Sequence, residues 1–108
     1  MVKLIAFLTP KPGMTLAQFK VRWVDEHTKI SSKMPGLKGY RININQAVQP
    51  DNAEPNYHGT AELWWDSVEA MEAAFASPEG VASGKDADEF CELRYHLYTD
   101  EYIVVPGP

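Results

Sequence analysis

The sequence predicts an α+β fold in which helices cover one face of an antiparallel sheet, the split β-α-β arrangement called ferredoxin-like. One observation behind this prediction is the order of local patterns, β-α-β-β-α-α-β over 108 residues. Another is that no repeat, low-complexity tract or second-domain linker occurs, so we expect residues 1–108 to form a single domain. The strands are expected at 2–9, 37–48, 57–65 and 94–105.

A buried strand is predicted at residues 2–9, VKLIAFLT, where strand-forming apolar residues predominate. Its even-numbered residues point to one side, and Ile5 and Phe7 point to the other. Because both sides are apolar, the sheet needs cover on both of its faces.

The first helix is predicted from its N-cap, Thr15, to about Ser31. Its apolar stripe recurs at helical spacing and consists of Leu16, Phe19, Trp23 and Ile30. His27 follows Trp23 by one helical turn and therefore lies on or beside that stripe. A titratable ring on a stripe that faces the core is the most suggestive feature of this sequence.

The segment Met34-Pro35-Gly36 ends this helix, because a residue before proline avoids the helical conformation. The strand at 37–48 follows, and then an exposed polar loop at 49–56. In the strand at 57–65, alternation places Tyr57, Gly59, Ala61, Leu63 and Trp65 on one side and His58, Thr60, Glu62 and Trp64 on the other.

Two more helices are expected before the last strand. One is capped by Asp66 or Ser67, with Asp66 and Glu69 matching a capping box. The next begins at Ser77-Pro78 and runs to about Leu93, and its glycines favour close packing against a neighbour. The strand at 94–105 and a tail at 106–108 complete the chain.

The sheet face away from the helices is expected to be dry, since it carries Ile5, Phe7, Trp64 and one side of an apolar last strand. The simplest cover is the same face of a second copy. The sequence therefore predicts a homodimer in which two sheets close into an α+β barrel.

Composition excludes several classes of function. A net charge of −5 without a basic run argues against nucleic-acid and membrane surfaces as partners. The single cysteine, Cys91, forms no internal disulfide, and no apolar run is long enough for a signal peptide or a membrane span, so we expect a cytoplasmic protein. No G-x-G-x-x-G, P-loop, C-x-x-C or H-x-x-x-H pattern signals a nucleotide cofactor or a metal.

Several separated motifs resemble one known family. They are F-x-x-x-W-x-x-x-H at 19–27, M-P-G-L-x-x-Y at 34–40, S-P-E-G at 77–80 and S-G-K-D-A-x-x-F at 83–90. Together they resemble the EthD-type dimeric α+β barrel proteins over nearly the whole chain. The resemblance implies a ferredoxin-like protomer that pairs sheet to sheet. It also implies kinship with small cofactor-free enzymes that cyclise, decarboxylate, dehydrate, isomerise or oxygenate aromatic and polyketide-like compounds.

The resemblance marks three residues as recurrent polar positions, and each has a chemical role to offer. His27 titrates near neutral pH and suits a general base. Asp86 suits the orienting partner of such a histidine, and Tyr40 suits a hydrogen-bond donor to a substrate oxygen. The alternatives are a helix-edge histidine, a surface carboxylate and an aromatic on a half-buried strand.

The remaining candidates concern substrate binding. Flat aromatic walls and polar groups on one strand are offered by Trp23, His58, Glu62, Trp64 and Trp65. At least two of the tryptophans are better explained as core. His96 is placed at the dimer contact, and Cys91 is read as a small buried hydrophobic residue.

Two hypotheses of function follow. The first is a cofactor-free, histidine-dependent acid–base enzyme, a lyase, cyclase, isomerase or oxygenase, for a small aromatic or polyketide-like molecule. The second is a non-catalytic protein that binds a hydrophobic metabolite or accompanies an oxidative enzyme. The sequence alone does not separate them, because the same pocket serves both.

Overall fold

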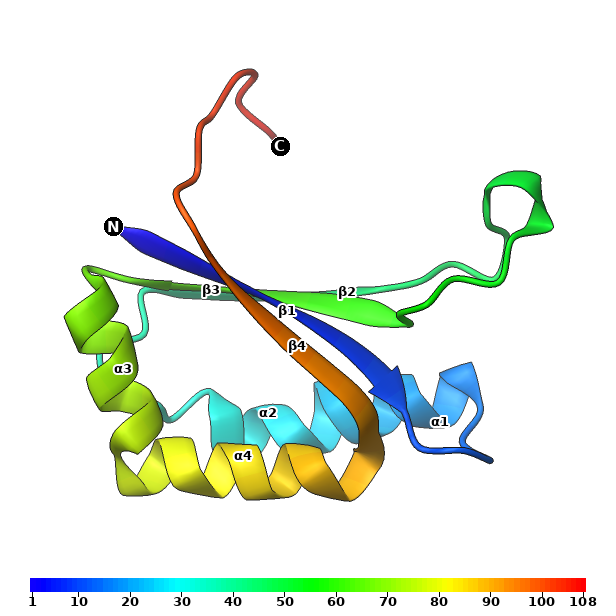
Figure 1. The fold of residues 1–108 in the computed structure, drawn as a ribbon, viewed down its shortest axis with the longest axis horizontal. Helices are drawn as coiled ribbons and strands as arrows, with labels where there is room; N and C mark the ends of the chain where they lie inside the picture. The colour runs from blue at the N-terminus through cyan, green and yellow to red at the C-terminus, as the bar shows by residue number, and fades with distance from the viewer.

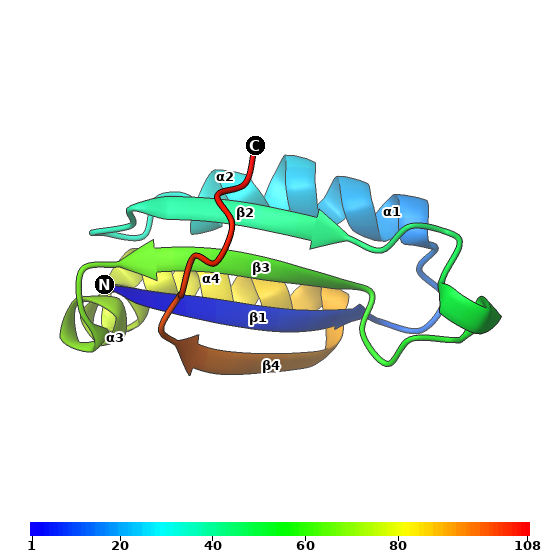
Figure 2. The same ribbon diagram turned by 90° about the horizontal axis from the view of Figure 1, so that it is seen from above.

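A computed structural model describes residues 1–108 and confirms the α+β fold class. The elements are β1 (Val2–Pro10), α1 (Leu16–Lys20), η1 (Val21–His27), α2 (Thr28–Ser31), β2 (Gly39–Ile44), η2 (Pro50–Asn52), β3 (Gly59–Trp65), α3 (Val68–Ala76), α4 (Pro78–Phe90) and β4 (Cys91–Thr99). The four-stranded sheet has the order β2-β3-β1-β4, and each neighbouring pair is antiparallel. The helices lie on one face of this sheet (Figures 1 and 2).

Alternation along β1 is as predicted. Val2, Leu4, Ala6 and Leu8 are all buried, whereas the residues between them are only partly covered. Because β1 lies between β3 and β4, its buried side forms the middle of the floor beneath the helices. The core cluster therefore lies between this floor and the helical layer.

The first helix begins at the predicted cap. The Thr15 side chain accepts a hydrogen bond from the Gln18 amide, and the Gln18 side chain accepts one from the Thr15 amide, which completes a capping box. The helical path continues to Ser31, as expected, but its middle seven residues, Val21 to His27, are π-helical. Nothing in the residue pattern indicated this widening.

The π-helical segment sets which residues face the sheet. Phe19, Trp23, His27 and Ser31 are all buried, at a constant spacing of four residues. In a regular α-helix, twelve residues would turn this line about 120° away from its start, since each residue turns about 100°. The wider π turn keeps the line straight. The predicted stripe was therefore wrong at its end, because Ile30 is only half-buried and Ser31 takes the inward position.

The strand at 57–65 was predicted two residues too early, and its first side chains were assigned to the wrong faces. β3 begins at Gly59. His58 packs edge-on against Phe19 on the helix side, and Gly59 faces Trp23 on that same side. Two consecutive residues on one side break the alternation, so Tyr57 packs on Phe7 at the opposite face.

The two later helices share one connection. Ser67 caps α3 by accepting a hydrogen bond from the Ala70 amide, so the capping box assigned to Asp66 and Glu69 was wrong. Ser77 caps α4 with Pro78 in its first turn, as predicted. Gly80 packs against the backbone of α3 so closely that no side chain fits there. No helix has the length and apolar character that crossing a membrane requires.

The last strand is displaced from its prediction. α4 ends at Phe90, three residues before the expected end, and β4 spans Cys91 to Thr99 instead of 94–105. Pairing with β1 explains the difference, because the ladder extends from Lys3↔Thr99 to Pro10↔Cys91 and overrides local helix preference. Residues 100–108 form an irregular arm that leaves the sheet on the side away from the helices (Figure 1).

Candidate functional site

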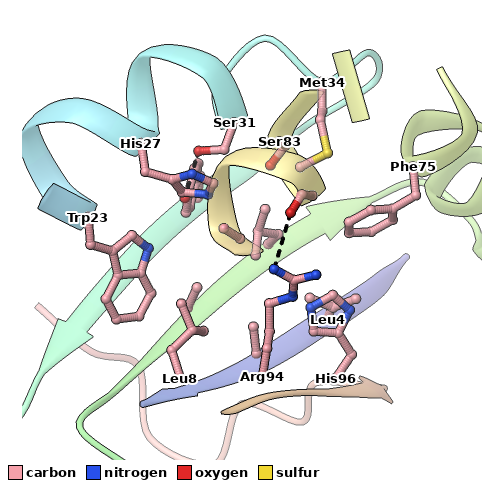
Figure 3. A pocket seen from close by; sticks show the side chains of 16 residues that line it. Leu4, Leu8, Trp23, His27, Ser31, Met34, Phe75, Ser83, Arg94 and His96 are labelled. Carbon is pink, nitrogen blue, oxygen red and sulfur yellow. Dashed lines mark hydrogen bonds between the residues drawn. The ribbon is translucent and has the colours of Figure 1, made fainter. Parts of the chain in front are cut away.

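A pocket of about 120 Å³ lies between the helical layer and the sheet (Figure 3). Its floor is apolar and comes from the inward side of β1 and β3, while its polar groups come from η1, α2, α4, β2 and β4. The lining consists of Leu4, Ala6, Leu8, Trp23, His27, Ser31, Met34, Tyr40, Ala61, Leu63, Phe75, Ser83, Gly84, Ala87, Arg94 and His96. Such a mainly apolar cleft with a few polar groups is typical of a small-molecule site.

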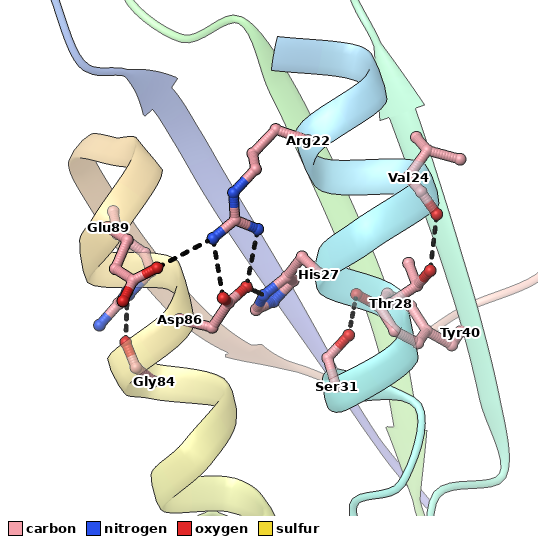
Figure 4. A network of polar contacts seen from close by, with 10 residues as sticks. Arg22, Val24, His27, Thr28, Ser31, Tyr40, Gly84, Asp86 and Glu89 are labelled. Atoms are coloured by element: carbon pink, nitrogen blue, oxygen red, sulfur yellow. Dashed lines mark hydrogen bonds and ion pairs between the residues drawn. The ribbon is translucent and has the colours of Figure 1, made fainter. Parts of the chain in front are cut away.

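His27 reaches this pocket from the last turn of the π-helical segment. Its Nδ1 lies 2.7 Å from Oδ2 of Asp86, which comes from the middle of α4 (Figure 4). An ionised carboxylate only accepts hydrogen bonds, so the proton of neutral His27 is on Nδ1. Nε2 consequently keeps its lone pair and has no hydrogen-bond partner within the protein.

The charges around this pair favour a neutral base beside an ionised acid. Hydrogen bonds from the Arg22 guanidinium hold the pKa of the Asp86 carboxyl below its ordinary value. Burial lowers the pKa of His27, although its hydrogen bond to Asp86 opposes that shift. The His27 side chain is only 7% exposed and its ring packs against Phe90 at 5.2 Å. The pair therefore presents a neutral, oriented imidazole to the pocket.

Tyr40 lines the same pocket from β2. Its hydroxyl is 2.9 Å from Oγ of Ser31, one turn beyond His27 on the same helical line. Burial raises the pKa of Tyr40, so the phenol stays protonated and can donate a hydrogen bond. Tyr40 is thus placed to donate either to Ser31 or to a bound oxygen atom.

Two polar residues on β4 complete the pocket, and both were missed as site residues. Arg94 and His96 lie opposite Leu8 and Ala6 of β1 and therefore share the inward side. His96 packs on Phe75 at 5.7 Å and forms no hydrogen bond with protein. His96 remains exposed in the protomer; partial desolvation of its ring, with a smaller contribution from Arg94, lowers its pKa. His96 was expected at the dimer contact; its ring lines the pocket, and its contact with a partner stays a prediction.

Four of the predicted binding residues are not in the pocket. Glu62 forms an ion pair with Lys3, and Lys3 and Arg41 both lie over the Trp64 ring at about 5 Å, all on the face away from the helices. Trp65 is core, and its Nε1 donates to the carbonyl oxygen of Pro35 at 3.0 Å. His58 lies beside Phe19 in a separate surface hollow, with its buried Nδ1 unpaired.

Cys91 and the acidic residues add no second centre of chemistry. Cys91 is buried at the start of β4, and burial raises the pKa of its thiol to about 12, so it is not a thiolate at neutral pH. No group of three or more His, Cys, Asp or Glu side chains is placed to hold a metal ion.

The missed residues differ in how visible they were. Ser31 follows His27 by four residues, and Arg94 and His96 alternate with outward-facing Tyr95, so both spacings were present in the sequence. Arg94 and His96 were not assigned to the site because β4 was predicted to begin three residues too late. Its pairing with β1, which decides which side chains face the helices, was therefore unknown. Arg22 gave no signal, since in a regular helix it would not face the same way as His27.

Comparisons with known proteins support this architecture. The sequence model described as the EthD domain matches residues 11–94. An uncharacterised 11.0 kDa protein from the thcB–thcC intergenic region of Rhodococcus erythropolis is 29% identical over 91 residues, which cover 83% of this chain and 86% of that protein. The crystal structure of an ethyl tert-butyl ether d (EthD) family protein from Bacillus halodurans has a TM-score of 0.78 at 29% identity, and the match covers 94% of this chain and 99% of that chain.

Two more distant structures share the fold. SnoaB, a cofactor-independent oxygenase from Streptomyces nogalater, has a TM-score of 0.69 at 12% identity, with 98% of this chain and 97% of that chain covered. A dimeric ferredoxin-like protein of unknown function from Thermobifida fusca has a TM-score of 0.70 at 17% identity, with coverage of 91% and 88%. At these identities the likeness concerns the fold.

Proposed function

The chain belongs to the EthD domain family, and from its pocket we propose that it is a cofactor-free acid–base enzyme for a small aromatic or polyketide-like compound. The observation that carries this proposal is the His27–Asp86 pair. It sets a neutral imidazole, with an unpaired Nε2, at the wall of an apolar pocket. A histidine oriented by a carboxylate in this way is the arrangement that general-base catalysis uses.

The size and lining of the pocket indicate the substrate class. A cavity of about 150 Å³ lined by apolar side chains holds benzene, and this pocket of about 120 Å³ is similar and open at one side. We therefore expect one ring to fit against Trp23 and the sheet floor. Polar atoms on that ring meet His27, Tyr40 and His96, which favours a phenol, enol or activated ketone.

The proposed first step is removal of a proton from an acidic C–H or O–H group by Nε2 of His27. Asp86 stabilises the imidazolium that forms, and Tyr40 or His96 donates a hydrogen bond to the substrate oxygen that gains charge. The resulting enolate or phenolate can then attack an internal carbonyl, expel a leaving group, take up a proton at another atom, or pass electrons to O₂. Cyclase, lyase, isomerase and oxygenase outcomes thus share one proton transfer.

We also propose that the protein acts as a homodimer that pairs the faces of the sheets away from the helices. The β4 side chains on this face remain exposed in the protomer: Leu93 by 54%, Tyr95 by 57% and Leu97 by 42%. They adjoin Phe7 and Tyr57, so the exposed surface is a continuous apolar patch of the kind that marks an interface. The dimeric ferredoxin-like relative supports this assembly.

The test begins with a panel of phenols, aromatic acids and anthrone-like compounds, screened for binding by the fluorescence of the tryptophans and by thermal shift. Compounds that bind are then incubated with the enzyme under air and under nitrogen, and products are followed by mass spectrometry. Product under both gases indicates cyclase, lyase or isomerase chemistry. Product under air alone indicates oxygenation.

The decisive comparison uses His27→Gln, with His58→Gln as a matched control, because His58 lies outside the pocket. We expect loss of turnover by a factor of about 10² to 10⁴ in the first variant and little change in the second. Binding without turnover of any compound by the wild type would refute the enzyme and leave a binding protein. Full turnover by His27→Gln would refute the assignment of the base.

A further inference from the structure

The catalytic pair is held by a third residue that the sequence did not reveal. Both terminal nitrogens of Arg22 contact the Asp86 carboxylate, Nη1 to Oδ2 at 3.0 Å and Nη2 to Oδ1 at 2.7 Å (Figure 4). This two-point contact fixes the plane of the carboxylate, which a single point charge does not do. Oδ2 is the same atom that accepts from His27.

Arg22 is itself fixed on its remaining sides. Its guanidinium carbon lies 4.8 Å from the centre of the Phe90 ring, and Nη2 also contacts Glu89 at 3.3 Å. The Phe90 ring packs against His27 as well. The Arg22 side chain is only 21% exposed, so its guanidinium forms part of the protein layer behind the pocket.

The π-helical segment brings Arg22 and His27 to the same carboxylate. They are five residues apart, and five residues of regular α-helix turn a side chain about 140° away from the first. In a π-helix, residues five apart are joined by a backbone hydrogen bond and lie nearly above one another. The Thr28 amide, which donates to the carbonyl of Trp23, shows this five-residue bonding at the end of the segment.

We propose that Arg22 is a positioning residue of the active site, and that the π-helical segment Val21–His27 brings Arg22 and His27 onto one carboxylate, that of Asp86. This inference rests on the proposed function, in which His27 is the base. Arg22 keeps the carboxylate ionised and aimed, so that Nδ1 of His27 carries the proton and Nε2 stays free. Arg22 does not line the pocket, so its effect on His27 is exerted through Asp86.

The charge of Arg22 has a second effect on His27. The charged groups facing the two residues are Asp86 and Glu89 from α4, Glu26 from η1, and Arg94 from β4. Among them, Asp86 favours a protonated imidazole, while Arg22 and Arg94 oppose it. Removal of Arg22 therefore leaves the carboxylate free to draw a proton onto His27, which would block its use as a base.

The test is a pH titration of the His27 ring by imidazole ¹⁵N NMR in the intact protein, without substrate. In wild type we expect the Nδ1–H tautomer and a protonation midpoint below 6.5. In Arg22→Met, which removes the charge but keeps a long side chain, the midpoint should rise by about one pH unit. Lys29→Met, which removes an exposed cation from the same helical stretch, should leave the midpoint in place.

A second variant guards against misfolding. Arg22→Lys keeps the charge but loses the two-point contact, so we expect a smaller rise in midpoint together with a mixture of His27 tautomers. An unchanged midpoint and tautomer in both Arg22 variants would overturn the proposal. These NMR readouts need no substrate, so the role of Arg22 is tested separately from the proposed enzymatic function. The midpoint and tautomer can stay unchanged in the Arg22 variants even if turnover depends on His27. They can also change even if no turnover is found. With a substrate in hand, the acid limb of kcat/KM should move with the midpoint.

Discussion

Lowering the pH should destabilise the protein through His27, in a way that one substitution isolates. The His27 residue is only 6% exposed, and burial lowers the pKa of its ring in the folded protein. In the unfolded chain the same ring titrates near its ordinary value of about 6.5. Below that pH His27 binds a proton in the unfolded chain but not in the folded protein. The free energy of unfolding therefore falls as pH falls, until the pKa of His27 in the folded protein is reached.

The size of the effect follows from the number of protons. One proton bound only by the unfolded chain changes the free energy of unfolding by at most about 1.4 kcal/mol per pH unit. His96 contributes in the same direction, because its pKa is lowered as well. Asp86 and Glu62 have lowered pKa values too, but their contributions are present above about pH 4 and are lost only below it.

The assay is urea unfolding of the wild type and His27→Gln at several pH values from 8 to 5, at fixed protein concentration, because the proposed dimer would make stability depend on concentration. Subtraction of the two curves cancels His96 and the other groups whose pKa does not depend on His27. The pKa of Asp86 does depend on it, but this carboxyl titrates below the pH range used. We expect a difference that is constant above pH 7 and then shifts in favour of the variant as pH falls from 6.5, by up to about 1.4 kcal/mol per unit. A difference that stays flat to pH 5 would show that burial does not disfavour protonation of His27.

Three further variants probe the pocket and the proposed dimer. Gly84→Ala should raise the free energy of unfolding by about 0.5–1 kcal/mol, since glycine is costly within a helix. It should also weaken the binding of an aromatic ring, because the new methyl group lies at the pocket wall. Stronger binding would contradict this. Gly59→Ala should lower the free energy of unfolding by about 1–3 kcal/mol in urea, because its methyl would lie 2.6 Å from a Trp23 ring carbon. Leu97→Asp should shift the mass measured by light scattering from dimer to monomer, and an unchanged mass would reject the open face as the interface.

The fold was predictable because its signals are local and mutually consistent. Thr15 and Ser77 are caps in the sequence and in the structure, and β1 alternates as its residues dictate. The boundary between α4 and β4 was not predictable in this way. Glu92, Leu93 and Arg94 are compatible with a helix, and the pairing of β4 with β1, distant in sequence, decides their state.

The site was predictable in part for the same reason. His27 stood out as a polar residue on an apolar stripe, and the motifs marked Asp86 and Tyr40; the structure brings these three together. Glu62 and Trp64 were assigned to the site from the alternation of one strand. Alternation places them on the same side of the sheet but does not say which side the helices cover. Arg22 reaches Asp86 from a π-helical turn, which the residue pattern of the first helix did not indicate.

If Nε2 of His27 removes a proton from a compound bound in the pocket, as proposed, that proton should exchange with solvent. The most direct measurement is exchange of the acidic C–H of a binding compound with D₂O, followed by ¹H NMR in the presence of wild type, His27→Gln and His58→Gln. We expect the wild type and His58→Gln to accelerate this exchange alike, and His27→Gln not to accelerate it. Equal acceleration by all three proteins would contradict the proposed role of His27.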